Sequence, residues 1–233
     1  MSKFKDQMRD WYSHPEIDTS TNIKRDRNFN RHMIEPCSMI AIVGPTGCGK
    51  STSILEFLSR KRDCWYRIIL FSGSTTDEPL VRLLKSKIPG IECIDNTDQL
   101  PELSDMDAED KTHEKLFIAD DVANLTKKQY STLQKWYCSA RKYGFTVVAL
   151  VQNYTDLPIQ IRRNVMYFFL FRLRDLNTIN QILRNHNVSG KEKEAIKRAY
   201  FEATAEKKNF FLLDLKPESQ APYRHNFTDI ITL

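Results

Sequence analysis

A glycine-rich segment at residues 44–52 constrains this chain more than any other feature. Three of the chain's seven glycines fall within six residues there. The segment matches the phosphate-binding loop pattern at every specified position, with the residues Gly44, Pro45, Thr46, Gly47, Cys48, Gly49, Lys50, Ser51 and Thr52. In such a loop the backbone N–H groups surround one anion, the lysine reaches the β- and γ-phosphates, and the next hydroxyl ligates Mg²⁺. The sequence therefore predicts a site for ATP and Mg²⁺, with Lys50 on the phosphates and Ser51 on the metal.

The residues on both sides of the loop support this interpretation. Before it, residues 39–43 form a short apolar run that is typical of a buried strand. After it, residues 53–62 carry apolar side chains at helical spacing, namely Ile54, Leu55, Phe57 and Leu58. The loop is thus expected to lead from a strand into the N-terminus of a helix, where the helix dipole favours a phosphate.

Short β-branched or aromatic runs alternate with helical segments along most of the chain. Strands are expected at residues 40–43, 67–72, 91–95, 115–119, 145–152, 167–171 and 210–215. Helices are expected at residues 52–62, 78–87, 126–143, 175–185 and 189–204. This alternation predicts an α/β fold, a P-loop NTPase core of three layers in which a mainly parallel sheet carries helices on both faces. We expect a polar N-terminal arm at residues 1–37, the ATPase core at 38–172, and a basic C-terminal helical segment with a final strand, packed on the core, at 173–233.

Charge is distributed unevenly, although the net charge is only +5. Residues 92–121 contain eleven acids and two lysines, whereas residues 161–200 contain nine Arg or Lys and three acids. We expect residues 98–110, acidic and poor in apolar side chains, to form a surface loop or short helix. A basic C-terminal half can hold a polyanion such as DNA. The alternative is that these charges solvate helix faces or pair with the acidic stretch of a neighbouring subunit.

The cysteines and the hydropathy of the sequence indicate the cellular compartment in which the protein is used. Five cysteines lie far apart without a Cys-x-x-Cys pair, at Cys37, Cys48, Cys64, Cys93 and Cys138. An odd number cannot all pair within the chain, which favours a reducing compartment. Because no apolar run reaches roughly 18 to 20 residues and the charged opening lacks a signal-peptide core, we expect no transmembrane segment and a protein used inside a cell.

A second motif is the apolar run at residues 116–119, which ends abruptly in Asp120 and Asp121. Ligands of open α/β sheets bind at the carboxyl ends of the strands, where a Mg²⁺-nucleotide site requires acids. Asp120 is therefore a candidate metal carboxylate, and Asp121 is a candidate base that orients and deprotonates the attacking water. The alternative is that both carboxylates only cap the following helix.

A third motif is the apolar strand at residues 147–151, which ends in the amide of Gln152. A glutamine there can donate to the γ-phosphate and accept from the lytic water, or it can be an ordinary loop amide. Just before this strand, Arg141 and Gly144 end a long helix. Arg141 can offset the dipole at the helix C-terminus, or it can project into the active site of a neighbouring subunit.

Together these motifs resemble those of the FtsK/HerA superfamily of DNA-pumping ATPases. The likeness rests on the loop, the strand ending in two acids, the Arg-Gly turn, and the strand ending in glutamine before residues 157–164. It covers residues 39–171 and is strongest toward the genome-packaging ATPases of large DNA viruses and virophages. The resemblance implies that Lys50 and Ser51 bind phosphate and metal, that Asp120 is the metal carboxylate and that Gln152 is the sensor. Many superfamily members have glutamate where Asp121 stands.

The same resemblance implies a homo-oligomeric ring, commonly a hexamer with a pentamer as the alternative. Such a ring moves double-stranded DNA, without sequence specificity, into a preformed viral capsid at a vertex or portal. An arginine finger acts in trans in this family; Arg141 matches best, with Arg162 or Arg163 as substitutes. The expected location is the host cytoplasm or a viral factory, or the virion itself.

Two other functions remain open at this point. In a small-molecule or nucleotide kinase, which can begin with the same loop, Arg172 and Arg174 would close over an acceptor phosphate. The two acids and the glutamine count against this, because a kinase uses an acceptor pocket in place of a positioned water. In a non-enzymatic assembly factor, the bound nucleotide would only stabilise a scaffold.

Overall fold

The protein folds around a single mixed sheet. The computed structural model describes residues 23–73, 79–95, 100–106, 110, 112–122, 125–185, 190–217 and 219–233. Within these residues the sheet has nine strands in the order β3-β2-β4-β5-β1-β6-β7-β8-β9. The strands are β1 (Met39–Val43), β2 (Arg67–Ser72), β3 (Glu92–Ile94), β4 (Lys115–Asp120), β5 (Phe145–Val151), β6 (Tyr167–Leu170), β7 (Phe211–Asp214), β8 (Tyr223–His225) and β9 (Asp229–Ile230).

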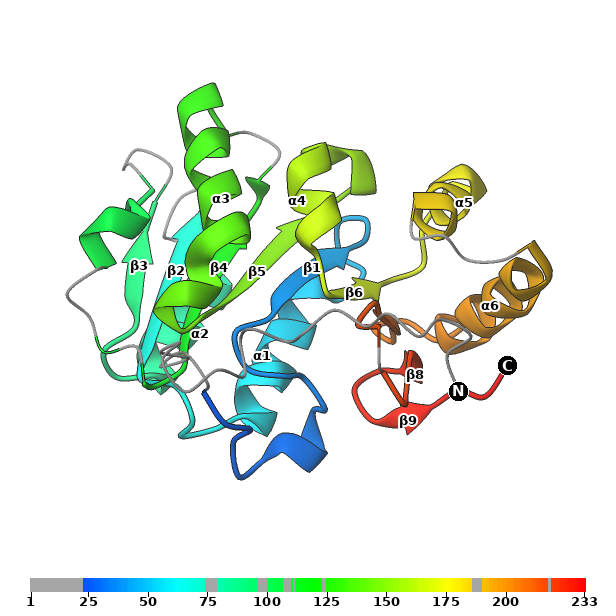
Figure 1. Cartoon of the computed structure of the whole chain (residues 1–233), viewed down its shortest axis with the longest axis horizontal. Coiled ribbons are helices and arrows are strands. Elements are labelled where there is room, and N and C mark those ends of the chain that lie inside the picture. Colours follow the sequence, from blue (N-terminus) through cyan, green and yellow to red (C-terminus); the bar gives the residue numbers. More distant parts are fainter. Residues whose placement is uncertain are drawn as a thin grey trace, which may run out of the picture.

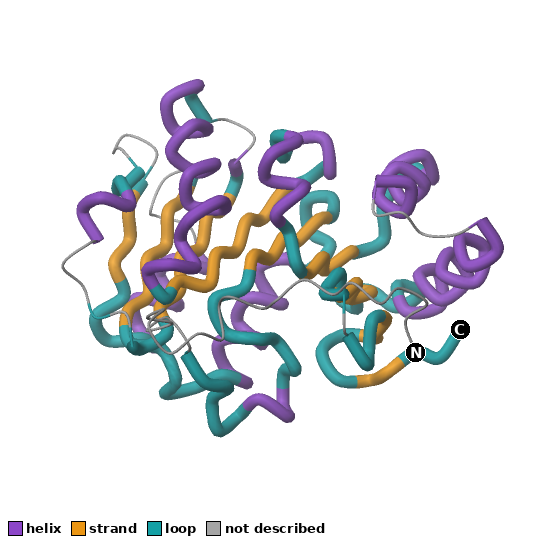
Figure 2. The backbone as a smooth tube through the Cα atoms, viewed as in Figure 1, coloured by secondary structure: helices purple, strands orange, loops and turns teal. Residues whose placement is uncertain are grey.

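Helices lie on both faces of this sheet (Figures 1 and 2). They are α1 (Lys50–Arg60), α2 (Pro79–Lys87), α3 (Lys127–Ser139), α4 (Ile159–Asn164), α5 (Leu176–Asn185) and α6 (Gly190–Ala203), with 3-10 turns η2 (Phe29–Arg31), η3 (Leu103–Met106), η5 (Ala140–Tyr143) and η6 (Tyr154–Asp156). Every residue of β1 and β5 is buried, as expected for parallel strands that are covered on both sides. The predicted three-layer architecture is confirmed.

The alternation of side chains along the strands divides the core into two clusters. In β1, Met39, Ala41 and Val43 pack into the cluster that contains residues of α3, α4, α5 and α6. Ile40 and Ile42 point to the opposite face, into the cluster that contains residues of α1 and α2. This alternation is the two-residue period of a pleated strand. Helix α1 therefore packs on the side of β1 that carries Ile40 and Ile42.

Six strands, from β3 to β6 in the sheet order, pair in parallel, and β7, β8 and β9 are antiparallel. The C-terminal segment therefore extends the sheet through the pairing of β7 with β6. The expectation that residues 210–215 form the final strand is wrong, because β8 and β9 follow. These two strands contain three and two residues, respectively, too few for a periodic signal. Helix α4 was not predicted either, since six residues form less than two turns.

Residues 23–37, predicted to be part of a polar arm, pack against the sheet instead. His32 and Ile34 are fully buried there. The buried side chain of Arg224 in β8 donates to the carbonyl oxygens of His32 and Met33 at 3.3 and 3.1 Å. Residues 1–22 of the predicted arm lie outside the described residues. No helix in the described part of the chain is long and apolar enough to cross a bilayer.

Candidate nucleotide-binding site

The candidate site lies where parallel strands end at one edge of the sheet. The register pairs Val43 with Val151 and Ala119 with Ala149, so β1, β4 and β5 finish side by side. The backbone N–H of Gly44 donates to the carbonyl oxygen of Val151 at 3.1 Å. The first residue of the loop is thus hydrogen-bonded to the residue that precedes Gln152.

The loop curls around its own lysine before helix α1 begins. Gly49 caps the helix with φ = 120°, a backbone conformation that residues with a side chain rarely adopt. The ammonium of Lys50 donates to the carbonyl oxygens of Gly44 and Pro45 at 2.7 and 3.2 Å. The N-terminus of α1 follows directly after the loop, where its N–H groups can donate to an anion.

The two acids lie at the C-terminal end of β4, where the chain changes direction sharply. Asp120 is the last residue of β4, and its Oδ1 accepts the backbone N–H of Asp121 at 2.9 Å. Asp121 has φ = 50°, in the left-handed region. The N–H of Gly73, just after β2, donates to the carbonyl oxygen of Asp120 at 2.9 Å. A Cβ on Gly73 would lie 2.1 Å from the Asp121 carbonyl oxygen, so only glycine allows this approach.

These elements enclose a pocket of about 370 Å³. Its lining residues are Thr46, Gly47, Gly49, Lys50, Ser51, Thr52, Asp120, Asp121, Leu150, Val151, Gln152 and Lys208. The structure therefore brings together the predicted lysine, hydroxyl, two acids and glutamine from three separate segments of the chain. Of the other loop residues, Gly44 is buried behind the loop, and Pro45 lines an adjoining hollow with Thr46, Gln152 and Arg174.

The three candidate arginines lie outside this pocket. Arg141 is exposed in η5, which leads into the first residue of β5, so it lies at the opposite edge of the sheet from Gln152. Arg162 is half-buried in α4, with its guanidinium 4.8 Å from the centre of the Tyr154 ring. Arg163 is exposed on the same helix. The N–H of Gly144 donates to the carbonyl of Arg141, which is the predicted glycine cap.

Sequence reasoning missed two residues of this site, Gly73 and Lys208. Gly73 follows a predicted strand, but only its contact with the backbone of Asp121 shows its importance. Lys208 lies in the turn between α6 and β7 and reaches the pocket from the C-terminal segment. A lone lysine in a polar turn carries no sequence signal, and so neither residue could have been selected from spacing or composition.

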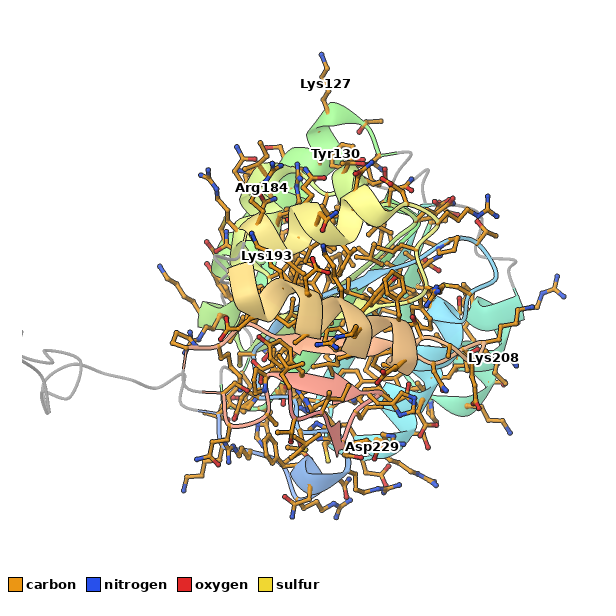
Figure 3. All side chains as sticks on the ribbon, turned by 90° about the vertical axis from the view of Figure 1, so that its right-hand side faces the viewer. Lys127, Tyr130, Arg184, Lys193, Lys208 and Asp229 are labelled. Carbon is orange, nitrogen blue, oxygen red and sulfur yellow. The ribbon has the colours of Figure 1, made fainter. Side chains whose placement is uncertain are left out.

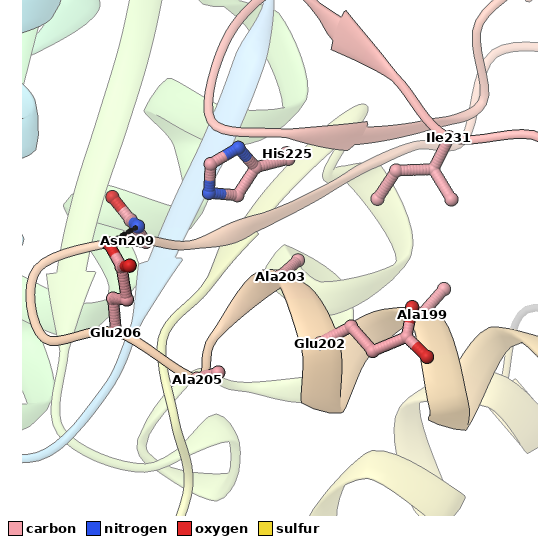
Figure 4. A pocket seen from close by; sticks show the side chains of 8 residues that line it. All are labelled: Ala199, Glu202, Ala203, Ala205, Glu206, Asn209, His225 and Ile231. Carbon is pink, nitrogen blue, oxygen red and sulfur yellow. Dashed lines mark hydrogen bonds between the residues drawn. The ribbon is translucent and has the colours of Figure 1, made fainter.

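A second hollow, of about 410 Å³, lies between α6 and β8 (Figure 4). It is lined by Ala199, Glu202, Ala203, Ala205, Glu206, Asn209, His225 and Ile231. Three of its polar side chains contact neighbouring side chains: the amide of Asn209 donates to Glu206, and His225 faces Asp229 at 3.3 Å. Because it contains no part of the phosphate-binding loop, we assign the nucleotide to the pocket at the strand ends.

A cluster of buried charges occupies the opposite edge of the sheet. Lys61, at the C-terminal end of α1, lies 2.5 Å from Glu114 and 3.3 Å from Asp26. Thr146 donates to Glu114 at 2.6 Å, and His32 lies 3.1 Å from Asp26. Lys61 and His32 are fully buried. We call Asp26, His32, Lys61 and Glu114 the basal charge cluster.

His32 is held in its neutral form within this cluster. Its Nδ1 accepts the backbone N–H of Ile34 at 3.0 Å, so its proton is on Nε2 and points to Asp26. Burial, followed by the positive charge of Lys61, lowers the pKa of His32 to about 4. Burial likewise raises the pKa of the Glu114 carboxyl, against the opposing charge of Lys61.

Two solved structures of viral packaging NTPases have a similar fold. The genome packaging NTPase B204 from Sulfolobus turreted icosahedral virus 2, in complex with AMPPCP, superposes with a TM-score of 0.59 at 12% identity, covering 84% of this chain and 98% of that one. The DNA-packaging ATPase B204 from Sulfolobus Turreted Icosahedral Virus gives 0.59 at 12% identity, with 85% and 100% covered. At this identity the likeness establishes the fold. No curated protein sequence matches the chain.

The family profile of the Poxvirus A32 protein matches residues 92–214. This range includes Asp120, Asp121 and Gln152 but begins after the phosphate-binding loop, so the loop and the family match are separate observations. The resemblance to viral genome-packaging ATPases that the sequence predicted is therefore confirmed for family and fold. The chain belongs to the Poxvirus A32 protein family and has the P-loop NTPase fold of the viral packaging enzymes.

Proposed function

We propose that this protein is the motor ATPase of viral genome packaging, which hydrolyses ATP to move double-stranded DNA into a capsid. The observation that carries the proposal is the single pocket that contains Lys50, Ser51, Asp120, Asp121 and Gln152. A phosphate-binding lysine, acids and a strand-end glutamine are the groups that a P-loop ATPase needs. Membership of the Poxvirus A32 family and the fold shared with B204 support the viral role.

The roles of the pocket residues follow from their chemistry. Lys50 and the loop amides neutralise the phosphate oxygens, while Asp121 and Gln152 hold a water in line with the γ-phosphate. Ser51 and Asp120 would hold Mg²⁺, since both line the pocket and offer the hard oxygen ligands that this ion prefers. The bound ion would supply positive charge to the β- and γ-phosphates. Few protein ligands are needed, because Mg²⁺ keeps several waters and takes the rest from phosphate.

The pocket has no arginine among its lining residues. Phosphoryl transfer spreads negative charge over the equatorial oxygens, and a guanidinium there raises the rate by about 10³ to 10⁵. Arg141 lies at the far edge of its own sheet, so any role in catalysis would be at the site of another subunit. We therefore propose a ring, a hexamer or a pentamer, in which each site is completed by Arg141, Arg162 or Arg163 of the adjacent subunit.

The basic C-terminal half is the proposed DNA-binding part of the ring. Arg163, Arg184 and Arg198 are exposed, and Arg184 and Lys193 lie on the α5 and α6 side that faces the viewer in Figure 3. Such contacts hold phosphates without reading bases. We expect log affinity to fall against log salt with a slope of about −0.9 per neutralised phosphate. We further propose that the ring works at a capsid vertex or portal, in the host cytoplasm or a viral factory, or within the virion.

The test is the rate of ATP hydrolysis as a function of protein concentration, with and without duplex DNA. A cooperative rise together with stimulation by DNA is the expected result. Phosphate transfer to a nucleoside monophosphate would favour a kinase instead. One observation already weighs against that alternative: Arg172, needed there as a lid arginine, donates to the Phe201 carbonyl at 3.1 Å and lies over the Phe201 ring. ATP binding without turnover at any concentration would favour the non-enzymatic scaffold.

The trans arginine is tested by mixing two inactive variants. Arg141→Ala keeps an intact pocket, and Asp121→Asn keeps an intact arginine while trapping bound ATP. Mixed rings should recover part of the hydrolysis, because some sites then combine a complete pocket with a complete neighbour. If no mixing ratio restores activity, Arg141 serves only the end of its own helix, and Arg162→Ala and Arg163→Ala replace it in the same experiment.

A further inference from the structure

The turn between α6 and β7 lies directly against the phosphate-binding loop. A Cβ placed on Gly49 would be 3.0 Å from Cα of Lys208 and 3.3 Å from its Cβ. Lys208 is exposed and lines the same pocket as Lys50, Asp120 and Asp121. Figure 3 shows its side chain at the rim of the molecule. A lysine from the C-terminal segment therefore stands beside the loop of its own subunit.

The backbone of Lys208 is held in a conformation that lysine seldom adopts. Its φ of 75° is in the left-handed region, where glycine is the usual residue. The neighbouring residues fix the turn: the Asn226 amide donates to Asn209 at 3.2 Å, and the N–H of Phe210 donates to the Asn226 side chain at 3.1 Å. Strained residues of this kind cluster at ligand sites. Asp121, on the other side of the pocket, has the same type of backbone conformation.

The charge of Lys208 is not used within the fold. Lys50 donates to two loop carbonyls, whereas the ammonium of Lys208 makes no hydrogen bond or ion pair with any of the described residues. A strained lysine without an internal partner, facing a pocket built for phosphates, is explained by a ligand that carries negative charge.

We propose that Lys208 is a second phosphate-binding lysine of the nucleotide site, acting from the α- and β-phosphate side. In phosphate-binding loops the backbone N–H groups cradle the α- and β-phosphates. Lys208 packs against Gly49, next to the amides at the start of α1. The ligand class is thus nucleoside di- and triphosphates. The proposal rests on the nucleotide-binding part of the proposed function and not on DNA movement.

The test compares two adjacent lysines that have the same charge. Lys207 is exposed in the same turn but does not line the pocket, so Lys207→Ala controls for the loss of one positive charge. Lys208→Ala should weaken the binding of fluorescent ADP and of a non-hydrolysable ATP analogue equally, by about tenfold, as expected for a charge-assisted hydrogen bond. Lys208→Arg should restore most of the affinity.

A third substitution of Lys208 separates a role in binding from a role in the stability of the fold. Lys208→Gly relieves the left-handed strain, so its melting temperature without nucleotide should be unchanged or raised while ADP binding falls as in Lys208→Ala. Loss of affinity matched by Lys207→Ala would overturn the proposal, and so would loss for the ATP analogue alone, which would place Lys208 at the γ-phosphate. These titrations use no DNA. A chain that binds ADP through Lys208 yet ignores duplex DNA would therefore contradict the motor and leave this inference standing.

Discussion

The two ends of helix α1 carry similar charged groups in opposite surroundings. At its N-terminus Lys50 shares an open pocket with Asp120 and Asp121. At its C-terminus, roughly 16 Å away by the helical rise, Lys61 is buried with Glu114 and Asp26. Each end of the helix thus places its own lysine near two carboxylates. In the cluster Lys61 and Glu114 are buried and Asp26 is 12% exposed, whereas Lys50, Asp120 and Asp121 line an open pocket that a ligand can reach.

This difference separates a binding site from a structural one. Charges taken out of water must be paired and hydrogen-bonded, and in the basal charge cluster Thr146 and the backbone N–H of Cys37 complete the partners of Glu114. Left-handed backbone does not distinguish the two sites, because it occurs at Asp121 and Lys208 around the pocket and at Met33 and Cys37 beside the cluster. We therefore expect groups of the same type to act on a ligand at one end of the helix, whereas at the other end they hold the N-terminal segment to the sheet.

The largest effect is expected on ATP turnover, from a change at Lys50 at the N-terminus of α1. Lys50→Ala should reduce ATP turnover by at least about 10³-fold, since the lysine's charge stabilises the transition state. The melting temperature without nucleotide should fall only slightly, because the side chain lines an open pocket and loses only its hydrogen bonds to the carbonyl oxygens of Gly44 and Pro45. Steady-state hydrolysis and thermal unfolding of the same sample test both expectations. Full activity in this variant would remove Lys50 from the site.

At the buried end the expected effect is on stability and not on binding. Lys61→Met removes the positive charge between two carboxylates and should lower the free energy of unfolding by about 3 to 5 kcal/mol. Urea unfolding measures the loss, and ADP affinity of the folded fraction should remain. Adding Glu114→Gln should restore part of the stability. A loss below about 1 kcal/mol would mean that the cluster does not behave as a buried pair.

The basal charge cluster should also make stability depend on pH. The pKa of His32 is lowered to about 4, below the value of about 6.5 expected in the unfolded chain. Between these values only the unfolded chain binds the proton, so stability should fall as pH drops from about 6.5 to about 4, by at most about 3 kcal/mol. Urea unfolding at several pH values tests this. His32→Gln should flatten that part of the profile, and an unchanged slope would assign it to other groups.

The smallest effect on stability is expected for an ion pair on the surface of α1. On the exposed face of α1, Arg60 and Glu56 form an ion pair at 2.7 Å, four residues apart. Glu56→Gln should lower the free energy of unfolding by only about 0.3 to 0.5 kcal/mol, because exposed pairs are screened by water. A loss as large as that of Lys61→Met would show that burial is not what distinguishes the two sites.

Much of this site could be predicted from sequence because its signals are local. The loop, the acids after an apolar run and the glutamine after another each occupy less than ten consecutive residues. Parallel strands end at a common edge, which was enough to expect that Lys50, Asp120 and Gln152 would meet there. The catalytic roles of these residues, and of the arginines, stay predictions until the experiments above are done.

The sequence by itself determined the α/β class, the nucleotide loop and the residues that follow β4 and β5, because each depends on the spacing of side chains within one segment. The tertiary structure alone decided that Lys61 and Glu114, 53 residues apart, form a buried pair. It also decided that residues 23–37 pack on the sheet, that Gly73 packs against the backbone of Asp121, and that Lys208 lines the pocket. Such contacts depend on strand register and on close approach of distant backbone segments, which no local periodicity encodes.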